Sequence, residues 1–413
     1  MAETAFIDTK SVSELAGERF VRECTQWFTR EKQWINERHL ELCRIPAPTF
    51  LEEQRAEWMT AQFRALGCDS RIDRAGNVIA HAFGRKEGPY IALTAHLDTV
   101  LSPRNAEDIR VSPDGKFLGP GVSDNGAGLA GLLAVTAALR SCVAAGDLQG
   151  SLLIVANVGE EGEGNLSGMR YLCRQSSLAP KIKGFVVLDG PAVDHITNQA
   201  LASRRFEIAI NGPGGHSWSD YGTGNPVHAL CRAISMLTEY RLNGGTPGPR
   251  STINFGTIDG GLSINSIPTV ARAKVDIRSE SPEKIEELAS LLTAAVERSL
   301  ETENERSSGP RVSAKIREIG SRPGGRMDEA AQILRYTRAV DAHLSIRSHL
   351  DCASTDANIP LSMGIPAVSI GAGGQGGGAH TPSEWYHPEG RDLGLRRILL
   401  LLLMLLKDLP EIA

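Results

Sequence analysis

The sequence predicts an α/β protein in which a larger domain, with a mixed sheet and helices on both faces, is interrupted by a smaller α+β domain. The larger domain is predicted by the alternation of apolar strand candidates with helices after about residue 66. The strand candidate Tyr90–Ala95, the long apolar helix candidate Leu129–Leu139 and the strand candidates Ser151–Val158 and Gly184–Leu188 follow in this order. Such alternation is typical of a sheet that buries both of its faces.

The smaller domain is predicted by a change of pattern between residues 199 and 319. Strands of alternating polarity here surround two helix candidates, Pro226–Leu242 and Pro282–Thr302, which is typical of an antiparallel sheet covered by helices. The α/β pattern then returns with the strand candidate Gly364–Gly371. We therefore expect one domain from residues 1–198 and 320–413, and an inserted domain from residues 199–319.

Helices are expected at both ends of the chain. Apolar residues between Ser11 and Leu66 recur near helical spacing until Pro46 and Pro48 interrupt the pattern. Near the end of the chain, residues 398–406 form an apolar run of nine residues, about half the length that a bilayer crossing needs. We interpret this run as a buried helix.

Composition and charge exclude several functions. The chain has 413 residues and a net charge of -5, without a dense run of Lys or Arg, so we expect no nucleic-acid binding. Because its longest apolar run is too short to cross a bilayer, we expect no membrane partner either. The N-terminus carries charges where a signal peptide would be apolar. The seven cysteines are scattered without a C-x-x-C pair, which argues against a disulfide framework and a zinc ribbon. The sequence therefore predicts a cytoplasmic protein.

Five segments place side chains that can bind metals directly after apolar strands or in glycine-rich turns. The carboxyl ends of strands are where ligands bind in α/β folds. A single His or Asp at such a place is commonly a cap or a hydrogen-bonding residue, but five together indicate one site. The residues are His96 and Asp98, Asp124, Glu160 and Glu161, Asp189, and His380.

These residue types suit a pair of zinc ions. Zinc takes imidazole and carboxylate ligands and leaves a position for water at a catalytic site, and two ions about 3.5–4 Å apart need a shared ligand. Asp124 is the natural bridge because its glycine-rich turn allows a close approach of the backbone. Asp98 lies two residues after His96, on the same side of an extended segment, where it can orient the imidazole. Of the adjacent glutamates, Glu161 would bind metal and Glu160 would act as the general base.

The order of these motifs, H-x-D, G-x-x-D-x-x-x-G, E-E, D and a final His, resembles the zinc-dependent exopeptidase family. That family includes peptidase T, glutamate carboxypeptidase, aminoacylase and succinyl-diaminopimelate desuccinylase. The resemblance implies a catalytic domain interrupted by a lid domain that usually makes a homodimer, and two zinc ions per subunit, with cobalt or manganese as other candidates. It also implies that His96, Asp124 and Asp189 hold one ion, that Asp124, Glu161 and His380 hold the other, and that Glu160 is the base.

Two segments of the predicted insertion extend the resemblance. NGPGGHSW resembles the lid motif of the family, whose histidine steadies the oxyanion in the neighbouring subunit; this implies that role for His216. The stretch SINSIPTVARAKVDIRS resembles the segment that supplies an asparagine and an arginine to the substrate, here Asn265 and Arg278. An arginine suits a carboxylate because its planar fork binds both oxygens. The alternatives are that Arg278 pairs within the sheet and that His216 caps a turn.

Three functional hypotheses follow. The first is a peptidase T-like aminopeptidase or dipeptidase that uses two zinc ions to cleave amide bonds of short peptides. The second is an N-acyl amino acid deacylase with the same metals and base, and the third is an inactive metal-binding module. Asp189 favours the first because several deacylating relatives have Glu there. Gly126, where many relatives carry Lys, and Val158, at an often polar position, are departures that bear on the substrate class rather than on the metal ligands.

Overall fold

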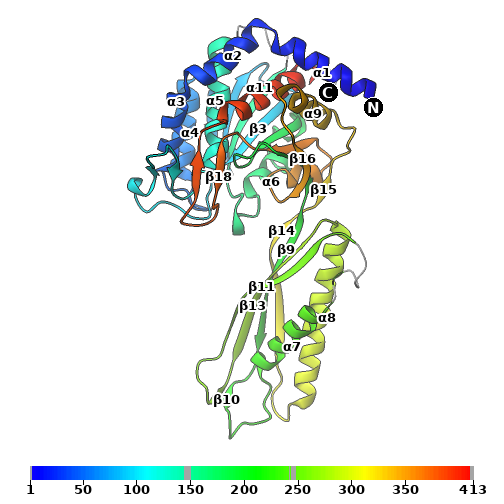
Figure 1. Ribbon diagram of the computed structural model, residues 1–413. Helices are drawn as coiled ribbons and strands as arrows, with labels where there is room; N and C mark the ends of the chain where they lie inside the picture. The colour runs from blue at the N-terminus through cyan, green and yellow to red at the C-terminus, as the bar shows by residue number, and fades with distance from the viewer. Residues whose placement is uncertain (1, 144–149, 241, 243–247, 410–413) are drawn as a thin grey trace. The chain divides into compact units, whose positions relative to one another are not determined.

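The computed structural model describes residues 2–143, 150–240, 242 and 248–409 and divides into two compact units (Figure 1). The large unit comprises residues 1–200 and 326–413, and the inserted unit comprises residues 201–325. Each unit has its own core of buried apolar side chains. The architecture confirms the predicted fold class, a mixed α/β sheet interrupted by an α+β insertion.

The large unit is built on a mixed sheet of nine strands. β3 lies at its centre and pairs in parallel with β6 on one side and β7 on the other. Every residue of β3 and β6 is buried, as expected for strands covered on both faces. The order is β1 (Asp69–Ile72), β2 (Val78–Phe83), β6 (Ser151–Asn157), β3 (Tyr90–His96), β7 (Ile182–Leu188), β17 (Ala367–Ile370), β8 (His195–Ala200) and β15 (Gly325–Arg326), and β16 (His349–Ala353) pairs with β8.

Helices cover both faces of this sheet (Figure 1). α5 is apolar nearly all round, and the leucines of α11 are buried except for Leu393. Each buried leucine side chain contributes about 1.5–3 kcal/mol. Among the described residues, no helix combines the length and the apolar character needed to cross a bilayer. The helices are α1 (Ala2–Ala16), α2 (Arg19–Arg30), α3 (Lys32–Cys43), α4 (Glu53–Ala65), α5 (Gly126–Cys142), α6 (Ser167–Arg174), α9 (Gln332–Leu344), α10 (Asn358–Ser362) and α11 (Arg391–Lys407), with 3-10 turns at Ala106–Asp108, Gly162–Gly164 and Ala179–Lys181.

A buried ion pair joins α11 to α9. The guanidinium of Arg397 donates two hydrogen bonds of 2.6 Å to the carboxylate of Asp341, and both side chains are buried. Arg397 also donates to the carbonyl oxygen of His195 in β8. This pair therefore links the two helices to the sheet.

A second small sheet lies beside the main one and brings distant parts of the chain together. Its order is β18 (Gln375–Gly377), β19 (Trp385–His387), β5 (Phe117–Leu118) and β4 (Arg110–Val111). Because β5 leads into the turn before α5, this pairing places the segment 373–387 next to the turn 119–124.

The inserted unit is an antiparallel sheet of four strands with α7 and α8 on one face (Figure 1). Asn225 and Ser281 cap the two helices, and a proline occupies the first turn of each. The predicted helix 226–242 ends at Glu239, while its residue 241 lies outside the described residues. The strand order is β11 (Ser251–Gly260), β13 (Val270–Ser279), β9 (Ala202–Asn211) and β14 (Ser313–Arg322); β10 (Gly215–His216) pairs with β12 (Ser266–Ile267), and the helices are α7 (Pro226–Glu239) and α8 (Pro282–Arg306).

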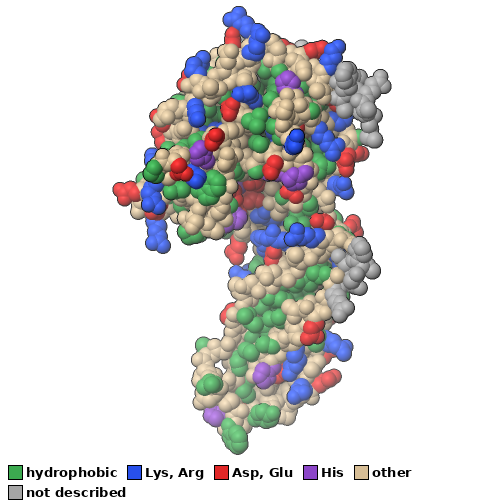
Figure 2. Space-filling model, in the orientation of Figure 1, with side chains coloured by type: hydrophobic (Ala, Val, Ile, Leu, Met, Phe, Trp, Pro, Cys, Tyr) green, Lys and Arg blue, Asp and Glu red, His purple; other side chains and the backbone are tan. Residues whose placement is uncertain are grey.

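Charged side chains of both signs are interspersed over the visible surface of each unit (Figure 2). In the inserted unit, ion pairs cross between neighbouring strands, as between Arg205 of β9 and Asp276 of β13. Pairs of this kind at a partly exposed surface contribute little to stability.

Candidate metal centre

The large unit places the predicted metal ligands at one edge of its main sheet. β3 ends at His96, β7 is followed directly by Asp189, and Glu161 lies four residues beyond the end of β6. Because β6, β3 and β7 are adjacent and parallel, their carboxyl ends meet at the same edge. Asp124 comes from the turn before α5, and His380 comes from the loop between β18 and β19.

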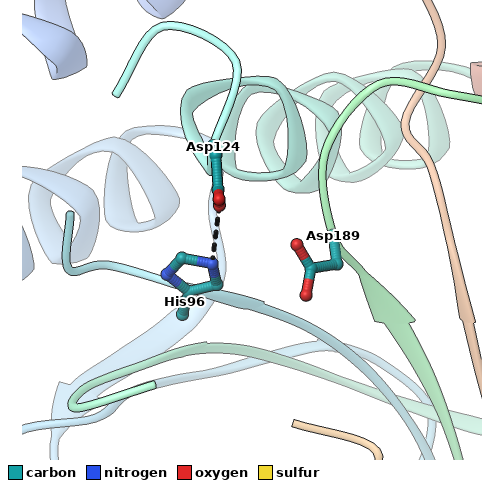
Figure 3. Close-up of side chains that lie close together, drawn as sticks. All are labelled: His96, Asp124 and Asp189. Atoms are coloured by element: carbon teal, nitrogen blue, oxygen red, sulfur yellow. Dashed lines mark hydrogen bonds and ion pairs between the residues drawn. The ribbon is translucent and has the colours of Figure 1, made fainter. Parts of the chain in front are cut away.

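A first group of possible ligands consists of His96, Asp124 and Asp189. One ligand atom of each lies within 4.8 Å of those of the other two. The Nε2 atom of His96 is 3.1 Å from Oδ1 of Asp124. Figure 3 shows the three side chains turned toward a common space, which is the arrangement needed to surround a cation.

A second group consists of Asp124, Glu161 and His380, again with ligand atoms within 4.8 Å of one another. The Nε2 atom of His380 is 3.0 Å from Oδ2 of Asp124 and 2.9 Å from Oε1 of Glu161. His380 adopts a left-handed backbone with φ of 65°, a conformation that is costly without a Gly and clusters at functional sites. Asp124 thus directs one oxygen to each group, as a carboxylate that bridges two metal ions must.

The charges of the two groups shift the pKa values of their members. Burial alone would lower the pKa of His96, but its hydrogen bond to Asp124 raises that pKa well above its ordinary value. Hydrogen bonds to Asp124 and Glu161 raise the pKa of His380 to about 10. Burial, together with the charge of Asp124, raises the pKa of Asp189. The carboxylates therefore favour positive charge between them, which protons on the imidazoles or metal cations can supply, and the donor set fits zinc.

Asp98 supports the centre through its backbone and its side chain. The Nδ1 atom of His96 donates to the carbonyl oxygen of Asp98 at 2.9 Å, while the Asp98 carboxylate is 3.6 Å away. The orientation predicted for the imidazole is thus provided mainly by the main chain, which leaves Nε2 for a metal. The carboxylate instead accepts hydrogen bonds from the backbone N–H groups of Glu160 and Glu161, each at 2.9 Å, and from Thr49. Glu160 is itself buried beside His96 and Glu161.

Glu384 is a supporting residue that the sequence analysis missed. Its buried carboxylate accepts hydrogen bonds from the backbone N–H groups of Gly121 at 2.7 Å, and of Ser123 and Asp124 at 2.8 Å. One short segment therefore carries His380 and also holds the turn that presents Asp124. The signal in the sequence was a glutamate four residues after His380, but nothing in the sequence indicates that its partners lie about 260 residues away.

The three predicted residues of the inserted unit have local partners. The Nδ1 atom of the exposed His216 accepts hydrogen bonds from the N–H groups of Trp218 and Ser219, so its proton resides on Nε2, available for donation. The carbonyl oxygen of Asn265 accepts from the N–H of Ser217, which ties two loops together. The Nε atom of Arg278 donates to Asp276 at 2.6 Å. Both local alternatives, a turn at His216 and a pair within the sheet at Arg278, are therefore present, and the roles of the three residues toward substrate stay predictions.

Comparisons with known proteins agree with this fold and point to metallopeptidases. The family model of the peptidase dimerisation domain matches residues 201–304, and that of peptidase family M28 matches residues 77–208. The uncharacterised protein YqjE of Bacillus subtilis is 26% identical over 83% of this chain and 91% of its own length. A succinyl-diaminopimelate desuccinylase of Rickettsia typhi is 29% identical over 54% of this chain and 61% of its own. The crystal structure of a tripeptidase from Staphylococcus aureus has the same fold, with a TM-score of 0.73, 22% identity, and coverage of 91% of this chain and 98% of that one.

Proposed function

Because the chain belongs to the M20/M28 zinc peptidases, hydrolases that act on amide bonds, we propose that it is a dinuclear zinc exopeptidase that cleaves short peptides. The observation that supports two metal ions is Asp124, which contributes an oxygen to each of two groups of ligands. His96 and Asp189 would complete the first site, and Glu161 and His380 the second. Zinc bound there would acidify a water molecule and polarise the carbonyl of the substrate.

Glu160 is the proposed general base. Its backbone is held by Asp98, and its side chain is buried beside His96 and Glu161. It would take a proton from the attacking water as the C–O bond forms, and would return that proton to the nitrogen as the C–N bond breaks. We expect Glu160→Gln to keep its metal and lose about 100-fold or more in kcat.

The cavity beside the cluster favours a peptide over an acyl-amino acid with a charged acyl group. It has a volume of about 590 Å³ and is lined by Asp124, Asp189, Asp194, the glycine-rich segment 374–379 and Trp385, among others, with no Lys or Arg among its lining residues. Asp124 and Asp189 would be engaged by the metal ions, which leaves Asp194 as the acidic lining residue that favours the ammonium of a free N-terminus and disfavours a second carboxylate such as that of a succinyl group.

A substrate panel tests the choice between peptidase and deacylase. The enzyme loaded with zinc is assayed with unblocked di- and tripeptides and with N-acetyl and N-succinyl amino acids. Release of amino acids from the free peptides alone supports the proposal. Turnover of the acylated compounds alone would replace it with the deacylase, and no turnover of any compound with metal bound would favour the inactive metal-binding module.

The inserted unit is proposed to act as a lid and to make a homodimer. In this dimer, His216 of one subunit would stabilise the oxyanion in the active site of the other subunit. Mixing two inactive variants tests this: Glu160→Ala and His216→Ala, unfolded together and refolded at equal amounts. If His216 acts across the dimer, each mixed dimer has one intact site and about one quarter of the wild-type activity returns. If the mixture stays inactive, although mixed dimers form, His216 does not act on the partner. Arg278 and Asn265 are proposed to contact the substrate, and Arg278→Lys should then raise KM more than it lowers kcat.

The proposed location is the cytoplasm. The structure records all seven cysteines as free thiols, a state that a reducing compartment maintains.

A further inference from the structure

Four exposed apolar side chains lie on two loops that lead into the metal centre. Phe50 and Leu51 are 65% and 69% exposed, and Val100 and Leu101 are 44% and 36% exposed. We call these four residues the apolar rim. Exposed apolar residues that lie singly are ordinary, but a group of them beside a cluster of metal-ligating side chains marks a surface that binds something.

The two loops of the apolar rim are held together and held to the centre. Pro48 forms a bridge with Thr99, and the N–H of Thr99 donates to the carbonyl oxygen of Ala47 at 3.0 Å. The hydroxyl of Thr49 donates to the carboxylate of Asp98 at 2.9 Å. Phe50 therefore directly follows Thr49, which contacts the Asp98 carboxylate. That carboxylate also holds the backbone of Glu160 and Glu161, and Val100 lies two residues after Asp98 in the sequence.

Hydrogen bonds on both sides of Phe50 and Leu51 anchor the loop that carries them. The side chain of Glu52, the next residue, accepts a hydrogen bond from the N–H of Gly159 at 3.0 Å, beside the glutamate pair. Phe50 has a φ of 76°, in the left-handed region that a bulky residue rarely adopts, and such outliers cluster at functional sites. A large apolar side chain is thus kept in solvent on a loop fixed at both ends.

We propose that the apolar rim binds an apolar side chain of the peptide substrate next to the bond that is cleaved. This inference rests on the proposed function. The rim differs in chemistry from the cavity on the Asp124 and Asp189 side, whose lining is rich in glycine and includes Asp194. A peptide that offers its ammonium to Asp194 and an apolar side chain to the rim would match both surfaces.

The test compares the holoenzyme with the double variant Leu51→Ser/Leu101→Ser on four tripeptides: Gly-Gly-Gly and the three peptides with one leucine. We expect the wild type to prefer leucine at one position, and the variant to lose about 10-fold in kcat/KM for that peptide while Gly-Gly-Gly is unchanged. Met363→Ser is the matched control, because it removes an apolar side chain that is 42% exposed and lies outside the rim. It should leave all four rates unchanged.

The remaining outcomes would contradict either the inference about the rim or the proposed function. If the wild type cleaves the tripeptides without preferring leucine, or if the double variant keeps the preference, the rim is not a substrate surface although the proposed function stands. If the variant loses activity equally on all four peptides and its mass by light scattering falls from dimer to monomer, the rim is covered by a second copy of the chain, and the inference is wrong. If no peptide is cleaved by zinc-loaded wild type, the proposed function itself fails.

Discussion

Glu384→Gln is expected to weaken both the fold and the metal centre. The carboxylate of Glu384 accepts three backbone hydrogen bonds, two at one oxygen and one at the other. Glutamine keeps an acceptor for Ser123 and Asp124 but turns an NH₂ group toward the N–H of Gly121. One buried donor then loses its partner, at about 1–3 kcal/mol, and two charge-assisted bonds become neutral, at about 0.5–1 kcal/mol each. We therefore expect a loss of about 3 kcal/mol in the free energy of unfolding.

The same substitution should lower metal affinity, because the turn that it loosens presents Asp124. Loss of a supporting partner of this kind typically costs about 10–100-fold in affinity. Urea unfolding of the metal-free protein measures the first effect, and competition with a chelator measures the second. Glu389→Gln is the control, because it makes the same chemical change at an exposed glutamate five residues further along the chain. If Glu384→Gln matches wild type in both assays, the carboxylate does not position Asp124, and the reasoning from its three hydrogen bonds is wrong.

Three further predictions concern stability, pH and metal content. Arg397→Met should lower the free energy of unfolding, measured in urea, by about 3–5 kcal/mol, because it leaves the buried charge of Asp341 unpaired. Adding Asp341→Leu should restore most of this loss. If Arg397→Met is as stable as wild type, the ion pair is not needed for stability. Burial holds the pKa of His39 well below its ordinary value, so the folded state binds fewer protons than the unfolded state. The free energy of unfolding should then fall as pH drops below about 6.5, by up to about 1.4 kcal/mol per pH unit, and this slope should be smaller in His39→Gln; equal slopes would assign the acid sensitivity to other groups. His380→Ala should reduce zinc from two ions to one per subunit by elemental analysis, and two retained ions would remove His380 from the ligand set.

The sequence could predict that the candidate ligands lie close together because several of them stand at the ends of apolar strands. His96 ends β3, which is buried along its whole length, and Asp189 follows β7, which is buried except at Lys183. The parallel order of β6, β3 and β7 brings such ends together. The alternating pattern of β13 likewise predicted an antiparallel sheet with one covered face. Local patterns of this kind are readable because strand period and burial act over a few residues.

The supporting contacts could not be predicted because they depend on tertiary pairing. The clamp by Glu384 and the hydrogen bond from Gly159 to Glu52 join residues more than 100 positions apart, and a carboxylate on its own has no periodicity that names its partner. His39 is a similar case. Nothing near it in the sequence distinguishes it from a surface histidine, but it is buried, with Arg391 donating to one ring nitrogen and the carbonyl oxygen of Val122 bonded to the other.

These contacts converge on one turn, and that convergence links metal binding to folding. The turn 119–124 is held by Glu384 and also by His39, which bonds to the carbonyl oxygen of Val122. Metal that binds the folded state alone stabilises it by about 2.7 kcal/mol at a concentration 100 times its Kd. Because Glu384→Gln should raise that Kd, the stability gap between the variant and wild type should widen when zinc is added at a fixed concentration. A gap that is the same with and without zinc would mean that the turn supports the fold and leaves the metal centre unaffected.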